Sequence, residues 1–308
     1  LKDCLAINST FMAHGNVNTS LSFSNTQWQG NKLTKIRIIN CKYVNFYNCS
    51  FTHIKNPIDC PILLIIRTIK LHMYKIIIFN ITGDSELIKI SYITHLRISA
   101  MLVNNIYHYG RRRNRKVKAF FFQHVSNIII WKMSLRYLQL TGFYIKDVGT
   151  VQITDSSFIN CICPVKLVIC KQKPNDTVIF NKSTFSGCLC KTQASVIHIS
   201  VGKQPKRSLT SLKVYLLYIV INKCWSETFA GGVSLTFTAR HSQDSDASTI
   251  VIISNGTFVN NTSDTQAGAV QITDAKTIEV SWCQFLGNFG ENGGAIQLMT
   301  VFLSLLFN

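Results

Sequence analysis

The sequence predicts an all-β protein, a right-handed parallel β-helix of about nine or ten coils. Three observations predict this fold: a short motif of alternating apolar and polar residues that recurs along the chain, a repeat length close to that of one solenoid coil, and a column of like residues at one position of the repeat. Together they indicate a solenoid in which each repeat packs on its neighbours.

The recurring motif is eight residues long. Its first, third and eighth residues are apolar, an alternation of period two that is typical of strands and not of helices. Consecutive motifs end 27, 25, 32, 23, 27, 36, 37 and 27 residues apart, which suits one solenoid coil with occasional insertions. The five strong copies end at Phe51, Phe158, Phe185, Phe258 and Phe285, and four weaker copies end at Ile78, Val103, Leu135 and Ile221.

The position three residues beyond each motif end provides an independent check. Like residues cluster there along the chain: aliphatics, then cysteines, then asparagines. Equivalent residues of successive coils stack about 4.8 Å apart, and stacked asparagines gain side-chain hydrogen bonds. We therefore expect a structural ladder at this position, beside a ladder of buried rings at Phe158, Phe185, Phe258 and Phe285. The residues at this position are Ile54, Ile81, Ile106, Leu138, Cys161, Cys188, Cys224, Asn261 and Asn288.

A second, glycine-containing motif follows the turn. The pairs Phe258-Val-Asn-Asn261 with Gly268-Ala-Val270, and Phe285-Leu-Gly-Asn288 with Gly293-Gly-Ala-Ile296, resemble the F-x-x-N and G-G-A-I repeats of polymorphic outer membrane proteins. Those repeats are similar to pectate-lyase-like right-handed β-helices. The resemblance covers about residues 145–298, with cysteine in place of asparagine in three copies and no counterpart to that family's membrane barrel. It implies a surface stalk or an adhesin-like role.

We expect one elongated domain over residues 1–308. Residues 1–40 are expected to form an irregular first coil or edge, with Phe11 ending an extra coil, and residues 145–298 the most regular repeats. The chain starts at Leu1 with no leader and has no apolar run of the roughly 20 residues that a membrane helix needs. We interpret it as a fragment of a longer protein whose remaining ends can carry a signal peptide or an anchor.

Cysteines and sequons indicate an extracellular or cell-surface location. The chain has 11 cysteines and nine N-x-Ser/Thr sequons. Asn261 heads a sequon but is expected to point inward, so a glycan is not expected there. The candidate glycan acceptors are Asn48, Asn175, Asn255 and Asn260.

The positive charge is concentrated in the first half of the chain. The net charge is +18, and residues 1–154 hold 20 Lys and Arg against five acids. Polyanion binding is one interpretation, and biased composition is the other. A candidate polyanion-binding loop is formed by Arg111, Arg112, Arg113, Arg115 and Lys116, for which a solvated loop, nuclear targeting and proprotein cleavage are the alternatives. The expected partners are acidic glycans or other surface proteins, with no nucleic acid.

Two cysteine pairs leave three interpretations open. Cys161-x-Cys163 and Cys188-x-Cys190 lie one coil apart, so four sulfurs are expected close together. Disulfides between neighbouring coils, a plain thiol stack, and tetrahedral zinc are the three alternatives, although C-x-C is tighter than usual zinc spacing.

We assign no catalytic, cofactor-binding or metal-binding residue, and we expect no cofactor. Glycoside hydrolysis usually needs two carboxyl groups about 5–10 Å apart. The outward acids Asp155 and Glu279 lie four coils, or about 19 Å, apart. The loop acids Asp84/Glu86 and Asp244/Asp246 are interpreted as solvated turn residues. We therefore expect a non-enzymatic structural or adhesion-like module, with a carbohydrate-binding or carbohydrate-active protein on the same scaffold as the alternative.

Overall fold

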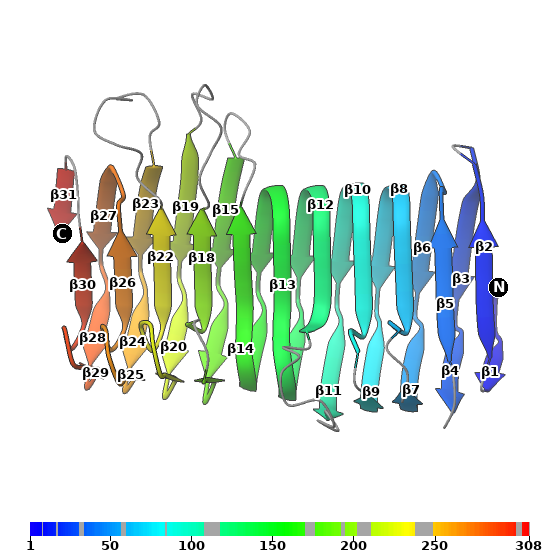
Figure 1. Cartoon of the computed structure of the whole chain (residues 1–308), viewed down its shortest axis with the longest axis horizontal. Coiled ribbons are helices and arrows are strands. Elements are labelled where there is room, and N and C mark those ends of the chain that lie inside the picture. Colours follow the sequence, from blue (N-terminus) through cyan, green and yellow to red (C-terminus); the bar gives the residue numbers. More distant parts are fainter. Residues whose placement is uncertain are drawn as a thin grey trace.

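The computed structural model of the chain confirms the parallel β-solenoid. It describes residues 1–308 except 8, 17, 31–33, 57–59, 84, 108–117, 170–175, 192–194, 202–210, 238–248, 300–303 and 308. The described residues contain no helix, and their strands pair in parallel from one end of the molecule to the other. Figure 1 shows these strands side by side along the long axis, with the two termini at opposite ends. Each coil contributes one strand to each of three faces, which we call A, B and C.

Face A carries the predicted motif end and the column three residues beyond it. In the C-terminal half a turn divides this strand into two short pieces. Its strands, in order of stacking, are β1 (Leu5–Ile7), β4 (Gln27–Gly30), β7 (Ser50–Asn56), β9 (Ile77–Gly83), β11 (Leu102–Tyr107), the first part of β13 (Ser134–Thr154), the first part of β14 (Ser157–Ile169), β16 (Thr184–Ser186) with β17 (Leu189–Cys190), β20 (Val220–Asn222) with β21 (Trp225–Ser226), β24 (Thr257–Val259) with β25 (Thr262–Ser263), and β28 (Gln284–Leu286) with β29 (Phe289–Gly290).

Face B follows after the turn that ends face A. Several of its strands run on into face C. A residue of positive φ, such as Tyr92 or His124, lies at the corner, and strand pairing resumes directly after it. Its strands are β2 (Thr10–His14), β5 (Lys35–Ile39), the first parts of β8 (Leu63–Tyr74), β10 (Ile88–Ser99) and β12 (Lys118–Trp131), the middle of β13, the second part of β14, β18 (Ile197–Val201), β22 (Val233–Phe237), β26 (Val270–Thr273) and β30 (Ile296–Met299).

Face C holds the first residues of the predicted motif and leads back to face A. Its strands are β3 (Ser20–Ser24), β6 (Tyr43–Tyr47), the second parts of β8, β10 and β12, the last part of β13, β15 (Asp176–Asn181), β19 (Leu212–Leu217), β23 (Thr249–Ser254), β27 (Thr277–Ser281) and β31 (Ser304–Phe307).

Each face holds eleven described strands, so the described residues form eleven coils and not nine or ten. The two additional coils precede the one that ends at Phe51. Trp28 pairs with Phe51, and Ala6 pairs with Trp28 in turn. The expectation that Phe11 ends the first coil is wrong: Phe11 lies on face B and pairs with Ile36. These two coils have alanine and tryptophan at the motif end, whereas the aligned motifs end in Phe, Ile, Val or Leu, so the motif does not identify them.

The register is the one that the nine aligned motif ends predict. Each motif end is the direct Cα partner of the next, from Phe51 with Ile78 through to Phe258 with Phe285. Inward side chains from the three faces form one continuous apolar core along the molecule. A side chain on each rung therefore packs on the equivalent side chain of the next rung, which is why volume and shape are repeated along the chain.

Asparagine is abundant because the corners of the coils need left-handed backbone. The corner from face C to face A places Asn48 at φ 51° and Asn255 at φ 54°. The turn within face A, just before the internal column, places Asn160 at φ 52° and Asn260 at φ 51°. Asparagine enters this region more readily than most residues. The sequence therefore places asparagine at recurring positions that point away from the core.

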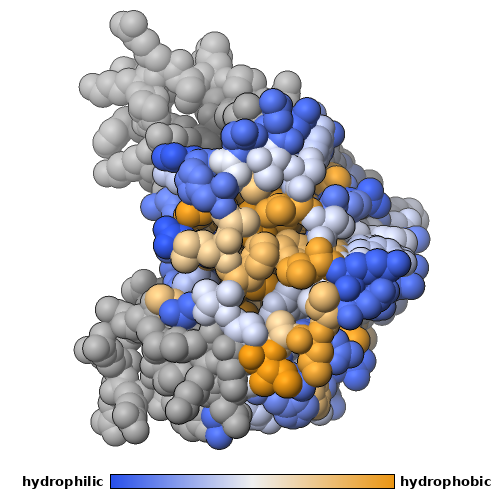
Figure 2. Space-filling view, turned by 90° about the vertical axis from the view of Figure 1, so that its right-hand side faces the viewer, coloured by the Kyte–Doolittle hydropathy of each residue, from blue (hydrophilic) through white to orange (hydrophobic). Residues whose placement is uncertain are grey.

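The N-terminal end shows the cross-section of the solenoid. Figure 2 looks onto it and shows an apolar centre surrounded by polar side chains. The inward residues Ala6, Phe11 and Leu21 of the first coil pack against this end of the core. The interior of the coil is thus apolar, and its polar residues lie on the outer surface.

Candidate ligand-binding surface

The four predicted phenylalanines lie on face A in one column. The rings of Phe158 and Phe185 stack at 4.5 Å with an interplanar angle of 3°, and those of Phe258 and Phe285 stack at 4.9 Å and 4°. Ile221 lies between the two pairs. Phe158, Phe185 and Phe258 are fully buried, whereas Phe285 is only partly buried and packs against the edge of the core.

The predicted column beyond the motif end has a common hydrogen-bonding role. Asn261 donates from Nδ2 to the carbonyl of Ile221 at 2.9 Å, and Asn288 donates to the carbonyl of Phe258 at 2.8 Å. These carbonyls belong to the motif end of the preceding coil. The asparagines also bond each other, because Asn261 Nδ2 and its backbone N–H both donate to Asn288 Oδ1 at 3.0 Å. Asn261 is 0% exposed, so the column is internal at this point.

The cysteines of this column make the same contact with a weaker donor. Cys161, Cys188 and Cys224 each donate from Sγ to the motif-end carbonyl of the preceding coil, over 3.5, 3.5 and 3.8 Å. Burial raises the pKa of the Cys224 thiol, which keeps it protonated and able to donate. A thiol is a poorer donor than an amide. Where asparagine replaces cysteine along the column, the hydrogen bond to the motif-end carbonyl of the preceding coil is therefore stronger, and the acceptor stays equivalent.

The expectation that four sulfurs lie together is wrong. Cys161 and Cys188 lie in the main core, whereas Cys163 and Cys190 form a separate small cluster with Ile162. Cys161, Cys188, Cys190 and Cys224 form no disulfide. No group of three or more His, Cys, Asp or Glu side chains within the described part of the chain is placed to hold a metal ion. Of the three interpretations, the structure thus describes the thiol stack.

The predicted glycan acceptors that are described lie at corners of the coil. Asn48, Asn255 and Asn260 are exposed, and all three have positive φ. Asn48 donates from Nδ2 to Asn25 at 2.9 Å. Asn260 and Asn261 are neighbours in sequence, yet the corner directs one outward and the other inward.

Several predicted residues lie outside the described residues. The following fall there: Arg111, Arg112, Arg113, Arg115, Lys116, Asn175, Asp84, Asp244 and Asp246.

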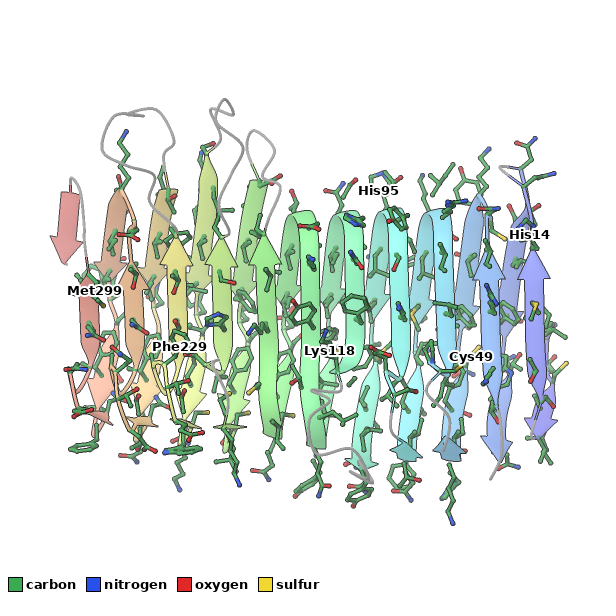
Figure 3. The ribbon with its side chains drawn as sticks, viewed as in Figure 1. His14, Cys49, His95, Lys118, Phe229 and Met299 are labelled. Atoms are coloured by element: carbon green, nitrogen blue, oxygen red, sulfur yellow. The ribbon has the colours of Figure 1, made fainter. Side chains whose placement is uncertain are left out.

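A cationic and aromatic row crosses the outer surface of face B. Lys89, Phe121, Tyr144 and Lys166 are direct partners on successive strands, one per coil. The rings of Phe121 and Tyr144 stack at 5.7 Å, with an interplanar angle of 25°. Lys118, at the start of β12, places its Nζ 3.8 Å from the centroid of Tyr144 and 4.7 Å from that of Phe121. Figure 3 shows Lys118 midway along the molecule on this face.

Lys146 on the next strand completes the group, which we call the Lys118 cluster: Lys89, Lys118, Lys146, Lys166, Phe121 and Tyr144. Burial lowers the pKa of Lys118, and the positive charges of Lys166, Lys89 and Lys146 lower it further. Glu86 acts in the opposite direction. Four positive charges thus lie close together on this surface. Among the described residues, the carboxylate of Glu86 partly compensates their effect on Lys118.

Sequence reasoning missed this cluster. Lys118 lies between the insertion 108–117 and the next copy of the motif. The repeat alignment therefore could not predict on which face of the solenoid its side chain lies. The available signal was Lys118-Ala-Phe-Phe-Phe122, a strand start with a cation and alternating rings.

Three of the described acids, Asp155, Asp264 and Asp147, contact other side chains. Asp155 accepts a hydrogen bond from Trp131 Nε1 at 2.8 Å, and Asp264 accepts one from Trp225 Nε1 at 2.7 Å. Asp147 lies 3.7 Å from His124 Nδ1. Asp155 follows the end of β13, and Glu279 lies on β27, four coils further along.

Further along the row of face B, polar side chains are covered. His198 pairs with Lys166 and with Ser234, and its ring lies 5.0 Å from that of Phe229. Figure 3 shows Phe229 on the same face, towards the C-terminal end. Burial lowers the pKa of His198 to about 4, and the charge of Lys166 contributes. The outward side chains of this row are therefore accessible at the Lys118 cluster, whereas His198 further along the row is buried beneath Phe229.

Comparison of the chain with protein-family models, with characterised proteins and with solved structures finds no match. Within the described residues, no helix is long and apolar enough to cross a bilayer.

Proposed function

We propose that this chain is a non-enzymatic structural and adhesion-like module of an extracellular or cell-surface protein. The observation that carries the proposal is the continuous core: apolar side chains from the first coils to the last belong to one cluster, and each rung repeats its neighbour. Such a solenoid is a stiff spacer that holds outward side chains at intervals of about 4.8 Å. Extended surfaces of this kind suit binding to long ligands.

The motifs that resemble polymorphic outer membrane protein repeats support a surface role. Asn261 and Asn288 of the F-x-x-N motif satisfy carbonyls at the turn. Gly268 of the glycine motif permits close approach of successive coils, because a Cβ there would clash with the carbonyl oxygen of Gly294 and the backbone of Phe289. The motif residues thus stabilise the stacking of coils, which favours a repeat of that type. Residues on the outer faces would then bind the ligand.

The alternative, a carbohydrate-active enzyme on this scaffold, predicts turnover. The chain would be incubated with acidic and neutral polysaccharides, and new reducing ends and unsaturated products would be measured beside retention on the same immobilised polymers. We expect saturable retention on at least one surface polymer and no product that increases with time. A product whose rate saturates with substrate would overturn the proposal, and so would the absence of retention on every polymer and on intact cells.

A further inference from the structure

We propose that the Lys118 cluster is a binding site for an acidic polysaccharide that lies along face B, parallel to the solenoid axis. This inference rests on the proposed adhesion-like function and names its ligand class and its site. It does not involve the basic run 111–116.

The arrangement of charge requires an extended anion. Lys89 and Lys166 lie three coils apart on one row, which is about 14 Å at the spacing of parallel strands. Lys118 and Lys146 lie beside the same row. A small anion reaches only part of this distance, whereas a linear polymer with a negative charge on each repeat can contact successive cations. Arg37 lies on the same row, two coils before Lys89, and extends the track.

Two of the four cations, Lys118 and Lys89, are held in place by the rings before any ligand arrives. The Nζ of Lys118 lies over both rings, and the Nζ of Lys89 lies 5.5 Å from the centroid of Phe121. Cation–π contacts of this kind fix the ammonium groups and reduce the entropy that is lost on binding. Because Lys118 is half-buried among like charges, an arriving anion relieves repulsion as well as gaining attraction.

The rings favour a glycan over a single-stranded nucleic acid. Binding of bases to aromatic platforms needs an open ring face. Here the face of Tyr144 is occupied by Lys118 at 3.8 Å, and Phe121 is in contact with Tyr144 and with two lysines. The cluster therefore presents positive charge, and its rings serve to position that charge.

The test is a titration of the intact chain with heparin as the probe, at low and at physiological salt. Lys118→Gln should weaken binding by about tenfold, since it removes one charge-assisted contact. Lys118→Arg should restore most of the affinity. Lys89→Gln should also weaken binding, although it keeps the half-buried Lys118 side chain. Lys213→Gln is the matched control: it removes the same charge from face C, where Lys213 pairs with Thr177 and Ile250, and it should change affinity by less than about twofold.

Oligodeoxythymidine and vesicles with phosphatidylserine are the competing probes. Equal binding by Lys118→Gln, Lys89→Gln and Lys213→Gln would overturn the site. Tighter binding of the oligonucleotide or of the vesicles than of heparin, with the same dependence on Lys118, would overturn the ligand class. Neither result involves turnover, whereas turnover of a polysaccharide would overturn the proposed function even if Lys118→Gln bound it less well.

Discussion

Replacing Asn261 by alanine should cost far more stability than replacing its exposed neighbour Asn260. The carboxamide of Asn261 accepts a hydrogen bond from the backbone N–H of Cys224 at 3.1 Å and donates to the carbonyl of Ile221 at 2.9 Å. Alanine leaves both backbone groups unpaired in a region without solvent. An unsatisfied buried group costs about 1–3 kcal/mol, so Asn261→Ala should lower the free energy of unfolding by about 2–6 kcal/mol. The third contact, to Asn288, adds to the effect.

The assay is urea unfolding together with hydrogen exchange of the Cys224 amide. Asn261→Ala should lower the urea midpoint and expose the Cys224 amide to faster exchange. Asn260→Gly is the control, because it removes an exposed carboxamide at φ 51° and glycine tolerates that backbone; we expect a change below about 1 kcal/mol. If Asn261→Ala cost no more than Asn260→Gly, and the Cys224 amide stayed protected, the reasoning about the internal column would be refuted.

Three further outcomes follow from the same structure. Phe185→Ala should cost about 3–5 kcal/mol through a cavity, and Phe285→Ala should cost less than half of that because this ring is partly exposed; equal losses in urea unfolding would contradict the burial described. Cys224→Asn should keep or raise the urea midpoint, since an amide replaces a thiol as donor to the Phe185 carbonyl; a large loss would show that the site has no room for the amide. Burial holds the folded pKa of His198 at about 4, below the usual unfolded value near 6.5, so the unfolded chain binds the proton first and stability should fall as pH drops from about 6.5 to 4, by up to about 3 kcal/mol. His198→Phe should remove this part of the pH dependence, and identical pH profiles of unfolding would count against it.

The repeat could be predicted from the sequence because stacking imposes the same requirement on every rung. A position that packs against its own equivalent in the next coil keeps its residue type, so Phe258 and Phe285, or Asn261 and Asn288, reveal the register without any structure. The first two coils were missed for the same reason, since Ala6 and Trp28 differ from the residues that define the motif.

The Lys118 cluster and the cover over His198 could not be predicted in this way. Both depend on residues of the turns and insertions, whose length varies from coil to coil. Lys118 joins Lys89 and Lys166 only through strand pairing between coils of unequal length. His198 occupies an outward position, but the turn that holds Phe229 covers it. Alternation of inward and outward residues defines the core of a solenoid, whereas its surface also depends on where the turns fold back.

Glycopeptide mapping tests the central claim, an extracellular β-helix whose column at Asn261 points inward, most directly. The chain would be secreted from a eukaryotic host as wild type and as Thr262→Ala, which destroys the sequon of Asn260 and keeps Asn261-x-Ser263 intact. We predict glycans at exposed corner residues such as Asn255 and Asn260 in the wild type, and none on the peptide with Asn261 in Thr262→Ala. Substantial occupancy of Asn261 in that variant would place its side chain in solvent during synthesis and contradict both the internal asparagine column and the register of the coils.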